Sequence, residues 1–173
     1  MVGEIRDTET LQMAIRSALT GHMVFSTVHC NDAASTAARL VDMGAEPFLL
    51  ASCLTMVIAQ RLARRICEQC REPFQPSPEV YAALGLDPSR GPAYRGAGCA
   101  FCRQTGYYGR EALFEVMPVT DEVRNAILRN APAPEIRQLI RAAGVPSLRD
   151  DGLNKAFAGV TTLEEVLRVT QLE

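Results

Sequence analysis

The chain has 173 residues, of which 47% are hydrophobic and 22% charged, a composition that excludes a disordered or collagen-like protein. Eighteen basic residues stand against twenty acidic ones, so the formal net charge is -2 and no overall positive field would attract nucleic acid. The longest apolar run is far shorter than the roughly 20 residues of a membrane-spanning helix, and the N-terminus lacks the apolar stretch of a secretory signal. We therefore expect a globular, cytoplasmic protein of one or a few domains with no nucleic-acid substrate.

The first third of the sequence alternates extended and helical patterns. Residues 2–5 have the character of the end of a strand, and Asp7 can cap a helix over residues 8–19, where apolar side chains recur at helical spacing. Residues 22–28 are short, apolar and rich in β-branched and aromatic side chains, which predicts a strand buried on both faces. This order of elements predicts an α/β layer.

Two further helices are predicted after the loop at residues 29–32. Asp32 is a candidate N-cap for a helix over residues 33–43. The next helix is predicted to run from Pro47 to Gln60, because proline suits a first turn and the longest apolar run follows it.

Four cysteines lie in a stretch after Arg61 that is rich in proline and glycine and shows little periodicity apart from a possible short helix over residues 79–84. They form two Cys-x-x-Cys pairs with 28 residues between them: Cys67, Cys70, Cys99 and Cys102. Four thiolates make a closed tetrahedral zinc site, which is structural because no coordination position stays open. Local disulfides, a redox motif and an iron–sulfur cluster are the alternatives. Cys30 and Cys53 lack partners at ligand spacing and are expected to pack as small apolar residues.

The last third of the sequence is predicted to be helical after one strand. Residues 107–116 form the predicted strand or hairpin arm, and they are followed by helical patterns over residues 121–129 and 134–143 and a broken pair over residues 148–169.

The chain's two histidines and one early carboxylate form a candidate polar cluster. Glu4 stands at the carboxyl end of the first predicted strand, and His22 and His29 stand at either end of the next. Ligands of open α/β sheets bind at that rim. By themselves, a glutamate after a glycine is more often a solvated turn residue, and histidines at strand ends are more often structural residues than ligands.

Motifs spread along the whole chain resemble one family. The sequence GEIRDTET over residues 3–10 is followed by TGHMVFSTVHCNDA over residues 20–33, and similar stretches continue at residues 60–67, 106–110, 114–116, 147–152 and 159–166. Together with the four cysteines, they resemble the cytoplasmic ATPases of type II secretion and type IV pilus assembly.

The resemblance implies an architecture and partners. Residues 1–66 would be the C-terminal portion of a RecA-like P-loop NTPase core, incomplete by itself. Residues 67–117 would be a tetracysteine zinc subdomain, and residues 118–173 an all-α C-terminal subdomain. In the family, the motor is a homo-hexamer associated with the inner membrane through platform and assembly proteins, and it couples hydrolysis of ATP with Mg²⁺ to the assembly of a pilus or pseudopilus.

The resemblance also implies roles for individual residues. Glu4 falls on the acidic residue of the Walker B segment, where a carboxylate polarises the attacking water and supports the Mg²⁺ shell. His22 and His29 match the histidine box near the γ-phosphate. Arg6 and Asp7 belong to the Walker B loop, which they would shape for cofactor binding. Cys30 stands where the family commonly has threonine.

The sequence contains no GxxxxGK[ST] phosphate loop, and its single lysine is Lys155. We therefore expect a C-terminal fragment of a secretion motor, whether a truncated or a naturally short chain, that is nearly inactive alone because it cannot hold the β- and γ-phosphates. The alternative is a non-catalytic, zinc-stabilised docking module that binds an inner-membrane platform protein or an intact motor. Type II secretion and type IV pilus assembly both remain open.

Overall fold

The structure, a computed structural model, describes residues 1–87 and 91–170. The chain folds into two compact units, each built from two separate stretches of sequence. Unit 1 combines Met1–Ala59 with Glu115–Val145, and unit 2 combines Gln60–Phe114 with the residues from Pro146 on. Within the described ranges, we find no helix with the length and apolar character needed to cross a bilayer.

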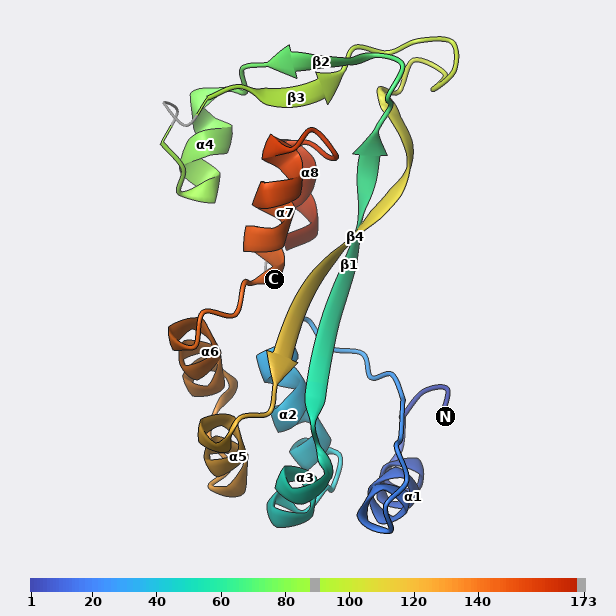
Figure 1. Cartoon of the computed structure of the whole chain (residues 1–173), viewed down its shortest axis with the longest axis vertical. Helices are drawn as coiled ribbons and strands as arrows, with labels where there is room; N and C mark the ends of the chain where they lie inside the picture. Colours follow the sequence, from blue (N-terminus) through green and yellow to red (C-terminus); the bar gives the residue numbers. More distant parts are fainter. Residues whose placement is uncertain (88–90, 171–173) are drawn as a thin grey trace. The chain divides into compact units, whose positions relative to one another are not determined.

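Unit 1 is built around five helices whose positions largely agree with the sequence prediction. They are α1 (Thr8–Leu19), α2 (Ala33–Asp42), α3 (Pro47–Cys53), α5 (Asp121–Leu128) and α6 (Ala133–Ala142) (Figure 1). Helix α3 packs on α1 and α5, and α2 packs on α6, so helices from both ends of the sequence share one core. Asp7 and Asp32 cap α1 and α2 as predicted, accepting hydrogen bonds from the backbone N–H groups of Thr10 and Ser35 at 2.8 and 2.7 Å.

The helix predicted from Pro47 to Gln60 is wrong beyond Cys53. Helix α3 ends there, and Met56 begins the long strand β1 (Met56–Ile66). In β1, Val57 and Ala63 are buried, whereas Met56, Ile58 and Leu62 are exposed, as expected for side chains that alternate between the two faces of a strand. An unbroken apolar run hides this alternation, because both faces of the strand carry apolar residues.

The strand predicted over residues 22–28 is extended but is not buried. Val2 and Ile5 donate backbone hydrogen bonds to the carbonyls of Phe25 and Thr27, both at 2.9 Å, so residues 2–5 lie beside this segment. Neither stretch has the regular ladder of a strand. Burial on both faces was a wrong prediction, because it requires packed layers on both sides of the segment and Met23 and Phe25 are 72% and 66% exposed.

Unit 2 contains the cysteine region and the last two helices. Its elements are α4 (Pro78–Leu84), α7 (Leu148–Phe157), α8 (Leu163–Thr170) and the antiparallel pair of β2 (Arg71–Phe74) with β3 (Ala93–Gly96). The sequence predicted the helices, but it did not predict β2 and β3. Strand β4 (Tyr107–Pro118), predicted over residues 107–116, pairs with β1 in a separate two-stranded sheet, and the two arrows run in opposite directions in Figure 1.

The described elements form a mixed α/β fold, as predicted at that level. The helices that follow β4 are divided between the units, since α5 and α6 belong to unit 1 and α7 and α8 to unit 2. The three consecutive domains expected from the sequence, with bounds at residues 66 and 117, stay a prediction.

A buried carboxylate in α8 accepts several charge-assisted hydrogen bonds. The side chain of Glu165 is fully buried and accepts hydrogen bonds from the backbone N–H and the guanidinium of Arg64, at 2.9 and 3.0 Å, and from the guanidinium of Arg168. Burial raises the pKa of Glu165, but these hydrogen bonds outweigh it and lower the pKa from 4.5 to about 2.

We expect Glu165→Gln to lower the free energy of unfolding at pH 7 by about 1–3 kcal/mol, because charge-assisted hydrogen bonds are lost. Since the folded pKa is depressed, Glu165 stabilises the wild type above pH 4.5 and loses this effect as the pH falls towards 2. The variant should therefore lose less stability than the wild type over that interval in urea unfolding. The control is Glu164→Gln at the exposed neighbouring position, and identical acid profiles for Glu165→Gln and the wild type would contradict the assignment.

Candidate functional site

The backbone pairing of residues 2–5 with residues 22–28 brings Glu4 close to His29. Glu4 Oε1 lies 2.8 Å from His29 Nε2, and Glu4 Oε2 lies 2.6 Å from Arg6 Nη2. The hydroxyl of Thr27 donates to the carbonyl of Gly3 at 2.9 Å and fixes the two segments next to these side chains. The predicted proximity of Glu4 and His29 thus follows from two neighbouring extended segments that end together.

The electrostatics of the pair keep Glu4 ionised at neutral pH. The hydrogen bond from Arg6 holds the pKa of the Glu4 carboxyl below its usual range, the charges of Arg6 and His29 act in the same direction, and burial opposes them. Oε1 is buried and has no hydrogen-bond partner among the described residues, although His29 Nε2 lies 2.8 Å from it. An ionised carboxylate with acceptor capacity left can polarise a water molecule or ligate a divalent cation.

The other residues predicted around this site have different surroundings. His22 Nδ1 lies 3.2 Å from the Thr20 hydroxyl and from the Ser17 carbonyl, at the end of α1. Both carboxylate oxygens of Asp7 are used to cap α1 through Thr10, which lowers the pKa of Asp7. The structure therefore brings together Glu4, Arg6 and His29, while the described contacts of His22 and Asp7 are local to α1.

Two residues that the sequence analysis missed contact the start of α2, directly after His29. Arg137 in α6 donates to Asp32, and Glu115 in β4 accepts a hydrogen bond from the N–H of Ala33 at 2.9 Å. Their separation from the loop in sequence, 105 and 82 positions, leaves no local signal by which they could have been found.

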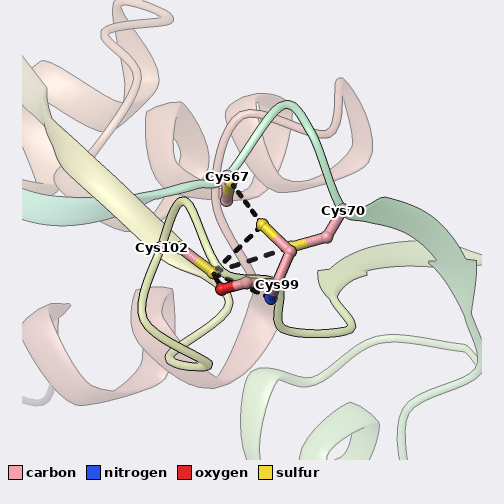
Figure 2. Close-up of side chains that lie close together, drawn as sticks. All are labelled: Cys67, Cys70, Cys99 and Cys102. Carbon is pink, nitrogen blue, oxygen red and sulfur yellow. Dashed lines mark hydrogen bonds between the residues drawn. The ribbon is translucent and has the colours of Figure 1, made fainter.

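The four cysteines form one cluster, as predicted. All four Sγ atoms lie within 4.8 Å of one another. Figure 2 shows the four side chains pointing toward a common centre, from the loop between β1 and β2 and from the loop between β3 and β4. The separations of 3.9 Å for Cys67–Cys99, 3.8 Å for Cys70–Cys102 and 3.7 Å for Cys99–Cys102 are far too long for disulfides. A tetrahedron with Zn–S bonds of about 2.3 Å has S···S edges of about 3.8 Å, so this donor set fits a tetrahedral metal ion.

Backbone groups around the cluster are arranged to support thiolates. The N–H groups of Cys99 and Gly106 donate to Cys102 Sγ, each at 3.3 Å. Burial raises the pKa of Cys102, but these donors outweigh it and lower the pKa to about 6. For Cys70, burial and the neighbouring thiols raise the pKa to about 12. The hydrogen bonds from Cys99 and Gly106 therefore stabilise the thiolate form of Cys102.

The loops around the cluster depend on glycine. A Cβ atom on Gly96 would lie 2.0 Å from the carbonyl oxygen of Gly106, which no side chain can tolerate. Gly106 itself has a φ of 75°, a left-handed conformation that glycine adopts without strain. This close approach lets the carbonyl of Gly106 accept a hydrogen bond from the N–H of Cys67 at 2.9 Å, which joins the two halves of the cysteine site.

Comparisons with known proteins agree on one family. Residues 1–168 match the family model described as Type II/IV secretion system protein. The type IV pilus assembly ATPase PilB of Thermus thermophilus is 49% identical over 98% of this chain and 20% of its own length. The type II secretion system protein E of Pseudomonas aeruginosa is 48% identical over the whole chain and 34% of its own length. The chain thus spans about a third or less of the curated relatives it matches.

Solved structures show the same fold at lower sequence identity. The Legionella pneumophila ATPase DotB superposes with a TM-score of 0.64 and 23% identity, covering 98% of this chain and 37% of that one. The pilus retraction motor PilT with bound ADP gives a TM-score of 0.64 and 24% identity, covering 97% and 39%. The chain therefore shares its mixed α/β fold with parts of these two proteins. With a family model matching nearly its full length, the chain belongs to the type II/IV secretion system protein family.

Proposed function

We propose that this chain is part of a secretion or pilus-assembly motor ATPase and supplies the catalytic carboxylate of its nucleotide site. The observation that supports this most directly is the ionised Glu4 carboxylate 2.8 Å from His29 Nε2, on motifs of a family whose relatives are ATPases. Glu4 polarises the water that attacks the γ-phosphate, and His29, 88% exposed and beside it, donates a hydrogen bond to the phosphate oxygens. When bound, Mg²⁺ neutralises charge that develops on the phosphates.

The other residues support this site in the proposal. Arg6 holds the Glu4 carboxylate in place through its ion pair, and Asp7 fixes the start of α1 directly after the site. His22, at the other end of the same extended segment, completes the histidine box. The four cysteines hold a structural Zn²⁺ with no open coordination position, so the metal stabilises unit 2 and takes no part in hydrolysis.

We further propose that residues 1–66 are the C-terminal portion of a RecA-like core and that the chain works within a longer motor. The phosphate-binding loop then lies outside these 173 residues, since no GxxxxGK[ST] occurs in them and the chain corresponds to about a third of type II secretion protein E relatives. The assembled motor is a cytoplasmic homo-hexamer that binds inner-membrane platform and assembly proteins and uses ATP to drive pilus or pseudopilus assembly.

The test compares MgATP turnover by the zinc-loaded chain with that of a longer protein that also contains a phosphate loop. We expect phosphate release at background level from the chain alone and multiple turnovers from the longer protein, because the backbone amides and lysine of the loop hold the β- and γ-phosphates. Equal turnover by both proteins would contradict the proposal of a separate phosphate loop. A longer protein that binds a platform protein but never hydrolyses ATP would favour the docking-module alternative.

A further inference from the structure

The loop that carries His29 ends at Asp32, whose carboxylate accepts hydrogen bonds from two residues. Asp32 Oδ1 accepts hydrogen bonds from the backbone N–H of Ser35, at 2.7 Å, and from the Ser35 hydroxyl, which caps α2. Asp32 Oδ2 accepts two hydrogen bonds from the guanidinium of Arg137 in α6, through Nε at 3.1 Å and through Nη2. The side chain of Asp32 is 6% exposed and that of Arg137 is 27% exposed, so the ion pair is largely removed from solvent.

A second contact holds the next residue from another direction. The N–H of Ala33 donates to Glu115 Oε1 at 2.9 Å, and Glu115 is 6% exposed. Glu115 lies in β4 and Arg137 in α6, so two elements that follow much later in the sequence hold the point where the His29 loop becomes α2. All of these residues belong to unit 1.

The cap of α1 shows that a helix start in this unit needs no such support. Asp7 uses both of its carboxylate oxygens to accept hydrogen bonds from Thr10, within its own helix, and stays exposed. Burying the charge pair at Asp32 costs desolvation that a solvent-exposed cap avoids. Hydrogen bonds from Ser35 and Arg137 nevertheless hold the pKa of Asp32 below its usual range, against the effect of burial, so the carboxylate is charged when it binds Arg137.

We propose that Arg137 is a positioning residue that, through Asp32, holds the His29 loop in the orientation that places His29 against Glu4. The Arg137–Asp32 ion pair connects α6 to the candidate nucleotide site. The planar guanidinium of Arg137 donates two hydrogen bonds in a fixed geometry and so fixes the orientation of the Asp32 carboxylate, which a single point charge cannot do. The catalytic meaning of this role rests on the proposed function, but the positioning itself concerns only this chain.

The first arm of the test uses the isolated chain and NMR spectroscopy. In Arg137→Met we expect amide exchange at Ala33 and Ser35 to accelerate by about tenfold or more, since charge-assisted hydrogen bonds at the start of α2 are lost. The imidazole signals of His29 should shift while those of His22 stay unchanged, which separates the two histidines of the chain. Arg137→Lys, which keeps the charge without the fork, should restore part of both effects.

The matched control is Arg129→Met. Arg129 forms an ion pair with Glu135 at 2.5 Å at the junction of α5 and α6 and is about half exposed, so its ion-pair partner is a residue of α6 and not of the His29 loop. This variant should leave the His29 signals and the exchange of Ala33 and Ser35 unchanged. If backbone amide exchange becomes uniformly faster throughout unit 1 in Arg137→Met, Arg137 stabilises the unit in general and does not position the loop, which would overturn the proposal. Unshifted His29 signals would overturn it too, and if the methionine variant does not fold, the same criteria apply to Arg137→Lys.

The second arm uses the complete motor and separates this inference from the proposed function. Arg137→Met should lower kcat for ATP while leaving KM for ATP within about twofold, because a misplaced His29 affects the reacting γ-phosphate more than nucleotide binding. A raised KM with unchanged kcat would contradict the positioning role. If the wild-type motor hydrolyses no ATP, the proposed function fails, whereas the NMR result for the isolated chain still decides whether Arg137 positions His29.

Discussion

Replacing Cys102 with serine is expected to release the metal and to unfold the region held by the four cysteines. The four Sγ atoms lie within 4.8 Å of one another, and β2 and β3, which flank the site, have four residues each. Binding of a structural zinc ion contributes on the order of 10 kcal/mol in small metal-stabilised domains, and a serine hydroxyl is a poor replacement for a thiolate. Metal content should fall from about one Zn per chain to near zero, with loss of protection against proteolysis at residues 67–106.

The matched control for this experiment is Cys53→Ser. Cys53 is partly buried in α3 of unit 1, donates to the carbonyl of Leu50 at 3.7 Å, and is not one of the four clustered cysteines of unit 2. We expect this variant to keep the zinc and the protease resistance of the cysteine region. Elemental analysis that finds no zinc in reduced wild-type protein, purified without chelators, would contradict the zinc assignment. Iron with visible absorbance in its place would identify an iron–sulfur cluster.

Replacing Glu4 with glutamine in the complete motor is expected to lower kcat for ATP hydrolysis by about 10²–10⁴, the range typical of removing a group that acts on the proton of the nucleophile. The amide keeps the size of the carboxylate but cannot accept a proton from the attacking water. KM for ATP should change little, because binding of the phosphates depends chiefly on the phosphate loop. Steady-state kinetics over a range of ATP concentrations measures both values.

The control for the glutamine variant is Glu9→Gln. Glu9 is an exposed residue in the first turn of α1, close to Glu4 in sequence, and it carries the same charge. We expect kcat within about twofold of the wild type, since this carboxylate supplies only a small helix-dipole interaction. Wild-type turnover in Glu4→Gln would rule out the catalytic role assigned to Glu4.

Elements whose cause is local were predicted well from the sequence. The caps of α1 and α2 were identified because an aspartate and an N–H three residues later are enough to form them. The cysteine cluster was predicted from two Cys-x-x-Cys pairs for a similar reason: each pair brings two thiols to one turn, and few arrangements can satisfy all four. The helices after β4 were located by their periodic apolar residues and by the prolines and glycines between them.

Predictions failed where the neighbours of a segment decide its structure. The apolar run after Pro47 contains the end of α3 and the start of β1, because a strand with apolar side chains on both faces has the same composition as a buried helix. The segment at residues 22–28 has the composition of a buried strand, but Met23 and Phe25 are exposed. The composition of a segment indicates whether its side chains are apolar enough to be buried. Whether they are buried depends on the layers that pack against the segment.

The sequence by itself therefore determined the mixed α/β class, the capped helices, the cluster of four cysteines and the candidate residues Glu4 and His29. Only the tertiary structure decided that Glu4 and His29 meet while the contacts of His22 are local to α1, and that Arg137 and Glu115 hold the start of α2. The physical reason is the range of the interactions. Helix caps and Cys-x-x-Cys pairs join residues a few positions apart. Ion pairs between distant segments form only once the packed helices and strands have brought their side chains together.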